Sequence, residues 1–143
     1  MTRKSIALAE HFPFSTEYVV LYSDVNAADH MGADRIPSVA IEAQLRFIIA
    51  LGYDEATAFE DAGLIMAHSE ISYLSETDYG DILRIDVAAD NFAKKSFDLV
   101  FSLNNLTKHS ETARVRNTML FFDYDNKSVV PVPQGFIAKI AAL

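Results

Sequence analysis

The fold is decided by residues 23–53, SDVNAADHMGADRIPSVAIEAQLRFIIALGY. The first part is a polar loop that contains three residues that could take part in chemistry, Asp24, Asn26 and His30. In the second part, residues 36–51, most side chains are apolar and they fall on almost every side of a helix. A helix that is hydrophobic nearly all round must be enclosed by the rest of its domain. Since no group of other helices is indicated, we expect a sheet to enclose it. The polar residues of residues 36–51 are Ser38, Glu42, Gln44 and Arg46.

The segments around this helix predict an antiparallel sheet. The helix should cover about residues 35–51, with Asp34 as its N-cap and Gly52 as the residue that ends it. We expect a short helical turn at residues 54–61, an extended piece at residues 129–130 and a short C-terminal helix at residues 135–143. Connections of hairpin length favour antiparallel pairing, so residues 1–143 form a single α+β domain. The predicted strands are residues 14–24, 64–74, 82–89, 96–103 and 112–123.

Composition excludes several classes of protein and of site. No apolar run is long enough to cross a membrane, and the apolar patch at residues 6–9 is too short for a secretory signal. There is no cysteine, which rules out disulfides and thiolate sites and fits a cytoplasmic location. A net charge of −8 opposes binding to nucleic acid and to anionic membranes. The spacing of the four histidines predicts no metal site.

Several short pieces of sequence, taken in order and register, resemble one known family. The set spans roughly residues 18–133 and is similar to the hot-dog fold thioesterases, in particular the 4-hydroxybenzoyl-CoA thioesterase-like branch of acyl-CoA thioester hydrolases. The pieces are SDVN at 23–26, HM at 30–31, EA at 42–43, FI at 47–48, LG at 51–52, EISYL at 70–74, YGD at 79–81, KSF at 95–97, FDYD at 122–125 and VP at 132–133.

The chain also departs from that family at some positions. Gly32 and Ala33 stand where two asparagines are frequent, and Gln44 stands for a frequent arginine. Ile36 replaces a frequent tyrosine and Glu76 a frequent proline. These departures keep open the alternative of a hot-dog module that binds acyl-CoA without cleaving it. An enoyl-thioester hydratase or dehydratase is a third reading.

The resemblance implies a curved antiparallel sheet wrapped around one long central helix, the hot-dog fold. It implies hydrolysis of acyl-CoA thioesters to free acid and CoA, with no cofactor because CoA is part of the substrate. It also implies that Asp24 is the catalytic carboxylate, acting as general base or nucleophile. The unpaired amides at the helix N-terminus would polarise the thioester carbonyl, and Gly32 would allow that carbonyl to approach the backbone closely.

The other candidate residues have both functional and ordinary interpretations. His30 would orient Asp24 or water, or hold the carbonyl; otherwise it is a surface residue. Asn26 would position water, or it is a turn residue. Glu42 would assist as a second carboxylate, or it pairs with Arg46 four residues on, in a polar stripe covered by loops or a second subunit. Lys94 and Lys95 would bind the CoA nucleotide, or they form a solvated turn.

An open sheet leaves its edge strands unpaired, and such edges favour pairing with a second copy. We therefore expect a homodimer or homotetramer with acyl-CoA bound at the subunit interface. An acyl-carrier-protein substrate is disfavoured, since that carrier is acidic like this chain.

Overall fold

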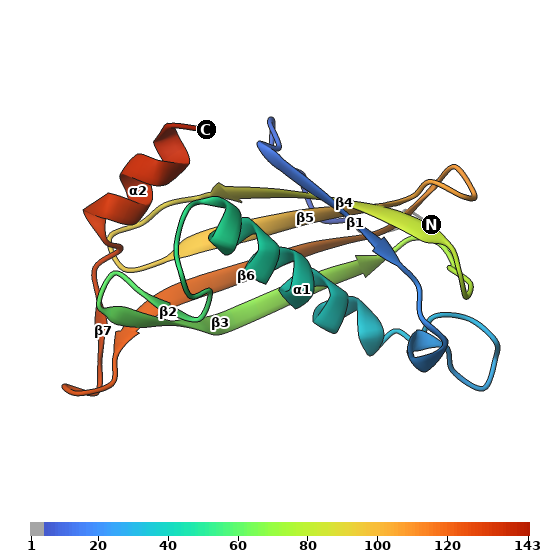
Figure 1. The fold of residues 1–143 in the computed structure, drawn as a ribbon, viewed down its shortest axis with the longest axis horizontal. Coiled ribbons are helices and arrows are strands. Elements are labelled where there is room, and N and C mark those ends of the chain that lie inside the picture. Colours follow the sequence, from blue (N-terminus) through green and yellow to red (C-terminus); the bar gives the residue numbers. More distant parts are fainter. Residues whose placement is uncertain (1–4) are drawn as a thin grey trace.

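One long helix lies against the hollow face of a curved antiparallel sheet (Figure 1). The computed structural model describes residues 5–143. The sheet has seven strands in the order β1-β4-β5-β6-β3-β2, and β7 pairs with the end of β6. The elements are β1 (Phe14–Val19), a 3-10 turn (Tyr22–Asp24), α1 (Arg35–Ala50), β2 (Ala58–Phe59), β3 (Ala62–Tyr73), β4 (Ile82–Asp90), β5 (Phe97–Asn105), β6 (Ser110–Asp123), β7 (Ser128–Val130) and α2 (Gln134–Ala141). The predicted α+β hot-dog architecture is confirmed.

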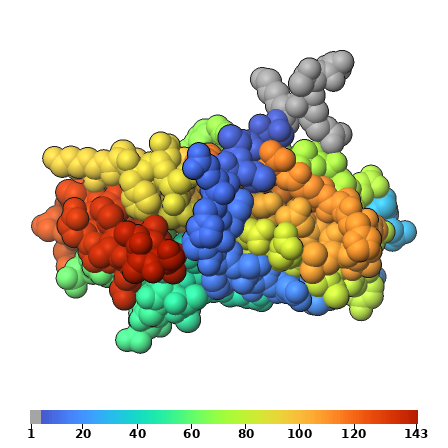
Figure 2. Space-filling view, turned by 90° about the horizontal axis from the view of Figure 1, so that it is seen from above, coloured from blue at the N-terminus to red at the C-terminus, as the bar shows by residue number. Residues whose placement is uncertain are grey.

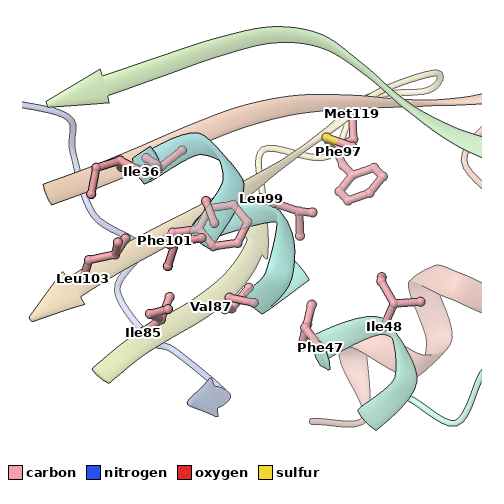
Figure 3. Close-up of a cluster of buried hydrophobic side chains, with 14 of the residues drawn as sticks. Ile36, Phe47, Ile48, Ile85, Val87, Phe97, Leu99, Phe101, Leu103 and Met119 are labelled. Carbon is pink, nitrogen blue, oxygen red and sulfur yellow. The ribbon is translucent and has the colours of Figure 1, made fainter. Parts of the chain in front are cut away.

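The core lies between α1 and the sheet. Every second residue of β4 points inward: Leu83, Ile85 and Val87 are at most 1% exposed. On β5 the alternating set is fully buried, and Figure 3 shows these side chains directed at α1. Full burial of each large apolar side chain contributes about 1.5–3 kcal/mol. This set is Phe97, Leu99, Phe101 and Leu103.

Helix α1 matches its predicted bounds but not its predicted environment. Asp34 occupies the N-cap position without a capping side-chain bond, and Gly52 ends the helix at a φ of +102°, a conformation that suits glycine. The prediction that the rest of the domain encloses this helix completely is wrong for the single chain. The sheet covers one face only, and on the other face Ile41 is 40% and Ile49 is 49% exposed.

Two predicted elements end differently in the structure. The first strand stops at Val19 rather than residue 24, because the chain turns where the Leu21 amide donates to the Asp24 carboxylate at 2.9 Å. Residues 54–61 do not form a helical turn. Instead Glu60 and Asp61, both with positive φ, make a tight turn that pairs β2 with the start of β3.

Different loops lie at the two ends of the sheet. At one end lie the segment after β1, the β3–β4 loop and the β5–β6 turn, and at the other lie the β4–β5 turn, β7 and α2 (Figure 1). β4 has 9 residues, so at ~3.4 Å per residue its two ends are about 27 Å apart.

The N-terminal segment crosses the outside of the sheet. The Ile6 amide donates to Ser72 Oγ at 2.9 Å, and Arg114 Nη1 donates to the Ile6 carbonyl at 3.0 Å. In Figure 2 this segment and β1 (blue) lie between the C-terminal helix (red) and the β5–β6 turn (orange). Within residues 5–143, no helix combines the length and apolar character needed to span a membrane.

Candidate active site

Asp24 lies at the junction of β1 and the loop that leads into α1. We call residues 24–34 the collar. The Asp24 side chain is 0% exposed, and both of its oxygens accept hydrogen bonds. Oδ2 accepts from the Tyr18 hydroxyl at 2.6 Å and from the Leu21 amide at 2.9 Å. Oδ1 accepts from Arg35 Nε at 3.0 Å.

These donors keep Asp24 ionised. Burial alone would raise the pKa of Asp24, but the hydrogen bonds from Tyr18 and Leu21 and the guanidinium of Arg35 outweigh it, so the pKa lies below the ordinary 3.8. Burial, together with the Asp24 carboxylate, raises the pKa of Tyr18 to about 12. The carboxylate is thus a charged anchor that fixes the end of β1 to the first residue of α1.

The collar backbone is held by its own hydrogen bonds. The Gly32 amide donates to the Asp24 carbonyl at 2.9 Å, and the Met31 amide donates to the Thr77 carbonyl of the β3–β4 loop at 2.7 Å. The Arg35 amide donates to the Gly32 carbonyl at 2.9 Å. The Gly32 N–H is therefore already paired within the chain. Among the backbone bonds of residues 5–143, none uses the amide of Ala33 or of Asp34.

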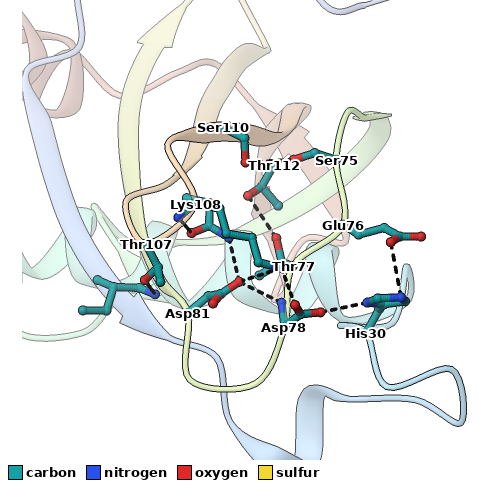
Figure 4. A network of polar contacts seen from close by, with 12 residues as sticks. His30, Ser75, Glu76, Thr77, Asp78, Asp81, Thr107, Lys108, Ser110 and Thr112 are labelled. Carbon is teal, nitrogen blue, oxygen red and sulfur yellow. Dashed lines mark hydrogen bonds and ion pairs between the residues drawn. The ribbon is translucent and has the colours of Figure 1, made fainter.

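His30 ties the collar to the β3–β4 loop through two carboxylates (Figure 4). Its Nδ1 lies 2.8 Å from Asp78 Oδ1, and its Nε2 lies 3.2 Å from Glu76 Oε2. The hydrogen bond with Asp78 is the main cause that raises the pKa of His30, and Glu76 adds to it. Asp78 also pairs with Lys108 of the β5–β6 turn. His30 is therefore directed away from Asp24 and toward the β3–β4 loop.

A cavity of about 320 Å³ lies where α1 begins. This volume is at the lower end of the ~300–1,000 Å³ typical of small-molecule sites. The cavity reaches only Ile36 of α1, and farther along the buried face of the helix Val39 and Ala43 are at most 1% exposed. The lining is Met31, Ala33, Ile36, Tyr73, Leu74, Ser75, Glu76, Thr77 and Thr112.

The remaining predicted site residues do not line this cavity. Asn26 is exposed and its Oδ1 accepts from the Ala28 amide, as a turn residue does. Glu42 pairs with Arg46 at 2.9 Å on the outward face of α1, about 12 Å along the helix from Asp34 at ~1.5 Å per residue. Lys94 and Lys95 are exposed in the β4–β5 turn, at the opposite end of the sheet from the collar.

Several residues of the site were missed by sequence reasoning. Tyr18 and Arg35 bind Asp24, and Glu76 and Asp78 bind His30. Of these four residues, only Glu76 was visible in the sequence as unusual, because it is a carboxylate where the family often has proline. The acidic groups near the site do not form a metal centre: within residues 5–143, no group of three or more His, Cys, Asp or Glu is placed to hold an ion.

The chain is similar in sequence to a known hydrolase and in fold to solved thioesterase structures. A 1,4-dihydroxy-2-naphthoyl-CoA hydrolase of Synechococcus elongatus is 25% identical over 124 residues, covering 85% of this chain and 90% of that protein. A thioesterase-superfamily structure from Jannaschia has a TM-score of 0.84 at 17% identity, covering 94% of this chain and 97% of the other. A mutant 4-hydroxybenzoyl-CoA thioesterase in complex with 4-hydroxybenzoyl-CoA has a TM-score of 0.79 at 17% identity, covering 89% and 97%.

The family is fixed by a match that is much longer than any of the short pieces noted in the sequence. The model of the thioesterase-like superfamily matches residues 20–140, which include the collar, α1 and the strands from β2 to β7. This protein belongs to the thioesterase-like superfamily.

Proposed function

We propose that this protein hydrolyses acyl-CoA thioesters to a free acid and CoA. The observation that carries the proposal is the cavity at the start of α1, where Ala33 lines the wall and the amides of Ala33 and Asp34 have no backbone partner among residues 5–143. Family membership and the similarity to a CoA-ester hydrolase support the same reaction.

The chemistry follows from the end of the helix. A thioester carbonyl gains negative charge on its oxygen when water attacks, and fixed N–H donors stabilise that charge. The Ala33 and Asp34 amides sit at the positive end of the α1 dipole, which favours an anion there. We assign the oxyanion role to these two amides rather than to the Gly32 N–H, which donates to the Asp24 carbonyl.

Asp24 has a supporting role in this proposal. A carboxylate with no exposed surface and both oxygens bonded would need to exchange Tyr18 or Arg35 for water before it could act as base or nucleophile. Its contacts instead support the role of a positioning residue that holds the collar, and with it the donor amides. The direct catalytic role implied by the family resemblance stays a prediction.

A second copy of the chain would complete the site. Along β3, residues 65–66 and 68–73 pair with β6, and no strand within residues 5–143 pairs with their other side. Residues 66–70 are exposed in a continuous run. The outward face of α1 carries the half-exposed Ile41 and Ile49. We propose that these surfaces form a homodimer by antiparallel pairing of two β3 edges. A homotetramer built from such dimers stays a prediction.

This arrangement also gives a role to Lys94 and Lys95 of the β4–β5 turn. Antiparallel pairing reverses the partner, so the partner's β4–β5 turn comes to the same end as the collar of this chain. The CoA nucleotide would meet Lys94 and Lys95 there across the interface, where two cations favour phosphate groups. A cytoplasmic location stays a prediction from the cysteine-free sequence.

A panel of acyl-CoA esters with a thiol-detecting reagent tests the function. The panel contains 1,4-dihydroxy-2-naphthoyl-CoA and 4-hydroxybenzoyl-CoA, because similar proteins carry those names, together with short and long aliphatic esters and an enoyl ester. Release of CoA supports hydrolysis. Binding without release would leave an acyl-CoA-binding module, and loss of enoyl absorbance without CoA release would identify a hydratase.

A further inference from the structure

Glu76 is a carboxylate that the sequence-based mechanism does not use, and it lines the same cavity as Ala33 and Ile36. Its side chain is 74% exposed, whereas that of Asp24 is 0% exposed. Hydrolysis needs a group that can reach both water and the thioester carbonyl. By accessibility, Glu76 meets this requirement and Asp24 does not.

Glu76 is held in place by His30. A neutral imidazole donates a hydrogen bond from one nitrogen only, yet both ring nitrogens of His30 face carboxylate oxygens. The doubly protonated imidazolium satisfies both contacts at once. In that form, Nδ1 is fixed by Asp78 and Nε2–H is directed at Glu76.

Asp78 is itself held by the neighbouring turn. Lys108 pairs with Asp78 and lies 3.4 Å from Asp81 Oδ2. The Asp78 amide donates to the same Asp81 oxygen at 2.9 Å. The position of His30 is thus set by three loops at this end of the sheet (Figure 4).

We propose that Glu76 is the general base of the thioester hydrolysis and that His30 and Asp78 are its positioning residues. The inference rests on the proposed function. Glu76 takes a proton from water while the water oxygen bonds to the carbonyl carbon, and the carbonyl electrons move to the oxygen beside the Ala33 and Asp34 amides. When the carbon–sulfur bond breaks, the CoA thiolate takes the proton from Glu76. The products are one carboxylic acid and one CoA thiol, and Glu76 is an anion again.

Charge favours this assignment. The imidazolium of His30 lies 3.2 Å from the Glu76 carboxylate and attracts it, while Lys108 offsets the negative charge of Asp78 behind it. The charged groups facing His30 are Glu76 and Asp78 of the β3–β4 loop and Lys108 of the β5–β6 turn. Activity should therefore fall partly as pH rises through the pKa of His30, which lies above the ordinary 6.5.

The test compares Glu76→Gln with a matched control on the best ester of the panel. Asp86 of β4 is likewise paired with a cation, Arg84, at 3.3 Å, and neither residue lines this cavity. We expect Glu76→Gln to lower kcat about 10²–10⁴-fold with KM changed by less than about threefold, since general base catalysis contributes that much. Asp86→Asn should leave both values near wild type. His30→Gln should give a smaller loss of kcat and abolish the alkaline fall, and Glu76→Asp should recover part of the activity.

The outcomes separate this inference from the proposed function. If the wild-type protein releases CoA and Glu76→Gln keeps kcat within about threefold while its melting temperature is unchanged, the base is elsewhere and this inference is overturned. An equal loss of kcat in Asp86→Asn would assign the effect to surface charge and overturn it as well. If the wild-type protein releases no CoA from any ester of the panel, both the inference and the proposed function are overturned.

Discussion

Arg35, the first residue of α1, donates from Nε to Oδ1 of Asp24 at 3.0 Å and so joins the helix to the chain that leaves β1. The carboxylate is buried and the guanidinium is 38% exposed, which makes this a half-buried ion pair. Removing one partner of such a pair leaves the charge of the other uncompensated. Substituting each partner of this pair therefore separates two roles of Asp24, that of a reacting carboxylate and that of a residue that positions the collar.

Asp24→Asn and Arg35→Met should behave alike. Each removes one side of the ion pair, and we expect each to lower the free energy of unfolding by about 1–3 kcal/mol. Each should also reduce kcat, because the donor amides of the collar move. Urea unfolding and steady-state kinetics measure both effects. A loss of kcat beyond about 10³-fold in Asp24→Asn alone, with stability and Arg35→Met both unaffected, would establish Asp24 as the reacting carboxylate.

The depressed pKa of Asp24 makes part of the stability pH-dependent. In the unfolded chain Asp24 binds its proton near pH 3.9, whereas in the folded protein it does so at lower pH. Its stabilisation is therefore complete above about pH 3.9 and is lost as pH falls through the folded pKa. Unfolding free energies measured from pH 6 to pH 2 should show a shallower decline in Asp24→Asn than in the wild type. Equal slopes would contradict the ionised, hydrogen-bonded state of this carboxylate.

The Asp34 amide can be removed with little change to the helix. Asp34 has a φ of −68°, which proline adopts without strain, and its N–H has no backbone partner within residues 5–143. Asp34→Pro should lower kcat about 10²–10³-fold, as expected for loss of one oxyanion donor. Asp34→Ala keeps the N–H and is the control. Similar kinetics in the two variants, with circular dichroism showing an intact helix, would remove this amide from the site.

The proposed dimer can be tested at its apolar face. Ile49→Glu places a charge on the exposed side of α1 and should convert the protein to a monomer in light scattering, with the monomer fold retained. Leu143→Glu is the control, since Leu143 is an apolar residue of similar exposure, 54%, that lies after α2 and not on this face. A wild-type protein that is already monomeric at high concentration would end the dimer proposal.

Reversing charge in the β4–β5 turn tests the nucleotide contact. Lys94→Glu with Lys95→Glu should raise KM for CoA esters by about tenfold and leave kcat nearly unchanged, because the turn meets the nucleotide rather than the reacting bond. The same change in an Ile49→Glu monomer should add no further defect. An unchanged KM in the dimer would show that the lysines form only a solvated turn.

The sequence was most informative where one physical pattern was sufficient. The strand predicted at residues 82–89 shows this: Leu83, Ile85 and Val87 are buried, because one face of the sheet is buried and a strand repeats every two residues. The end of α1 followed from Gly52 alone. Such features depend on neighbours along the chain, so a single sequence contains them.

The candidate site depended on contacts between distant segments. The partners of Asp24 come from β1 and α1, and those of His30 come from the β3–β4 loop, which no local pattern brings together. The distance between the collar and Lys94 follows from β1 pairing with β4, two strands that are not neighbours in sequence. The outward face of α1 was misjudged for a related reason: its apolar residues need a cover that this chain does not supply.

The collar is closed by its own contacts, and this limits how its length can vary. Asp24 and Arg35 fix its two ends, and the bond from the Asn26 amide to the His30 carbonyl at 2.9 Å closes a smaller loop inside it. An inserted residue there would change where α1 begins relative to β1. The tip of the β6–β7 hairpin, residues 124–127, is exposed, and the amides of Asp125 and Asn126 donate to Asp123 within the same hairpin. Among homologues, insertions and deletions should therefore accumulate at that hairpin and be excluded from the collar.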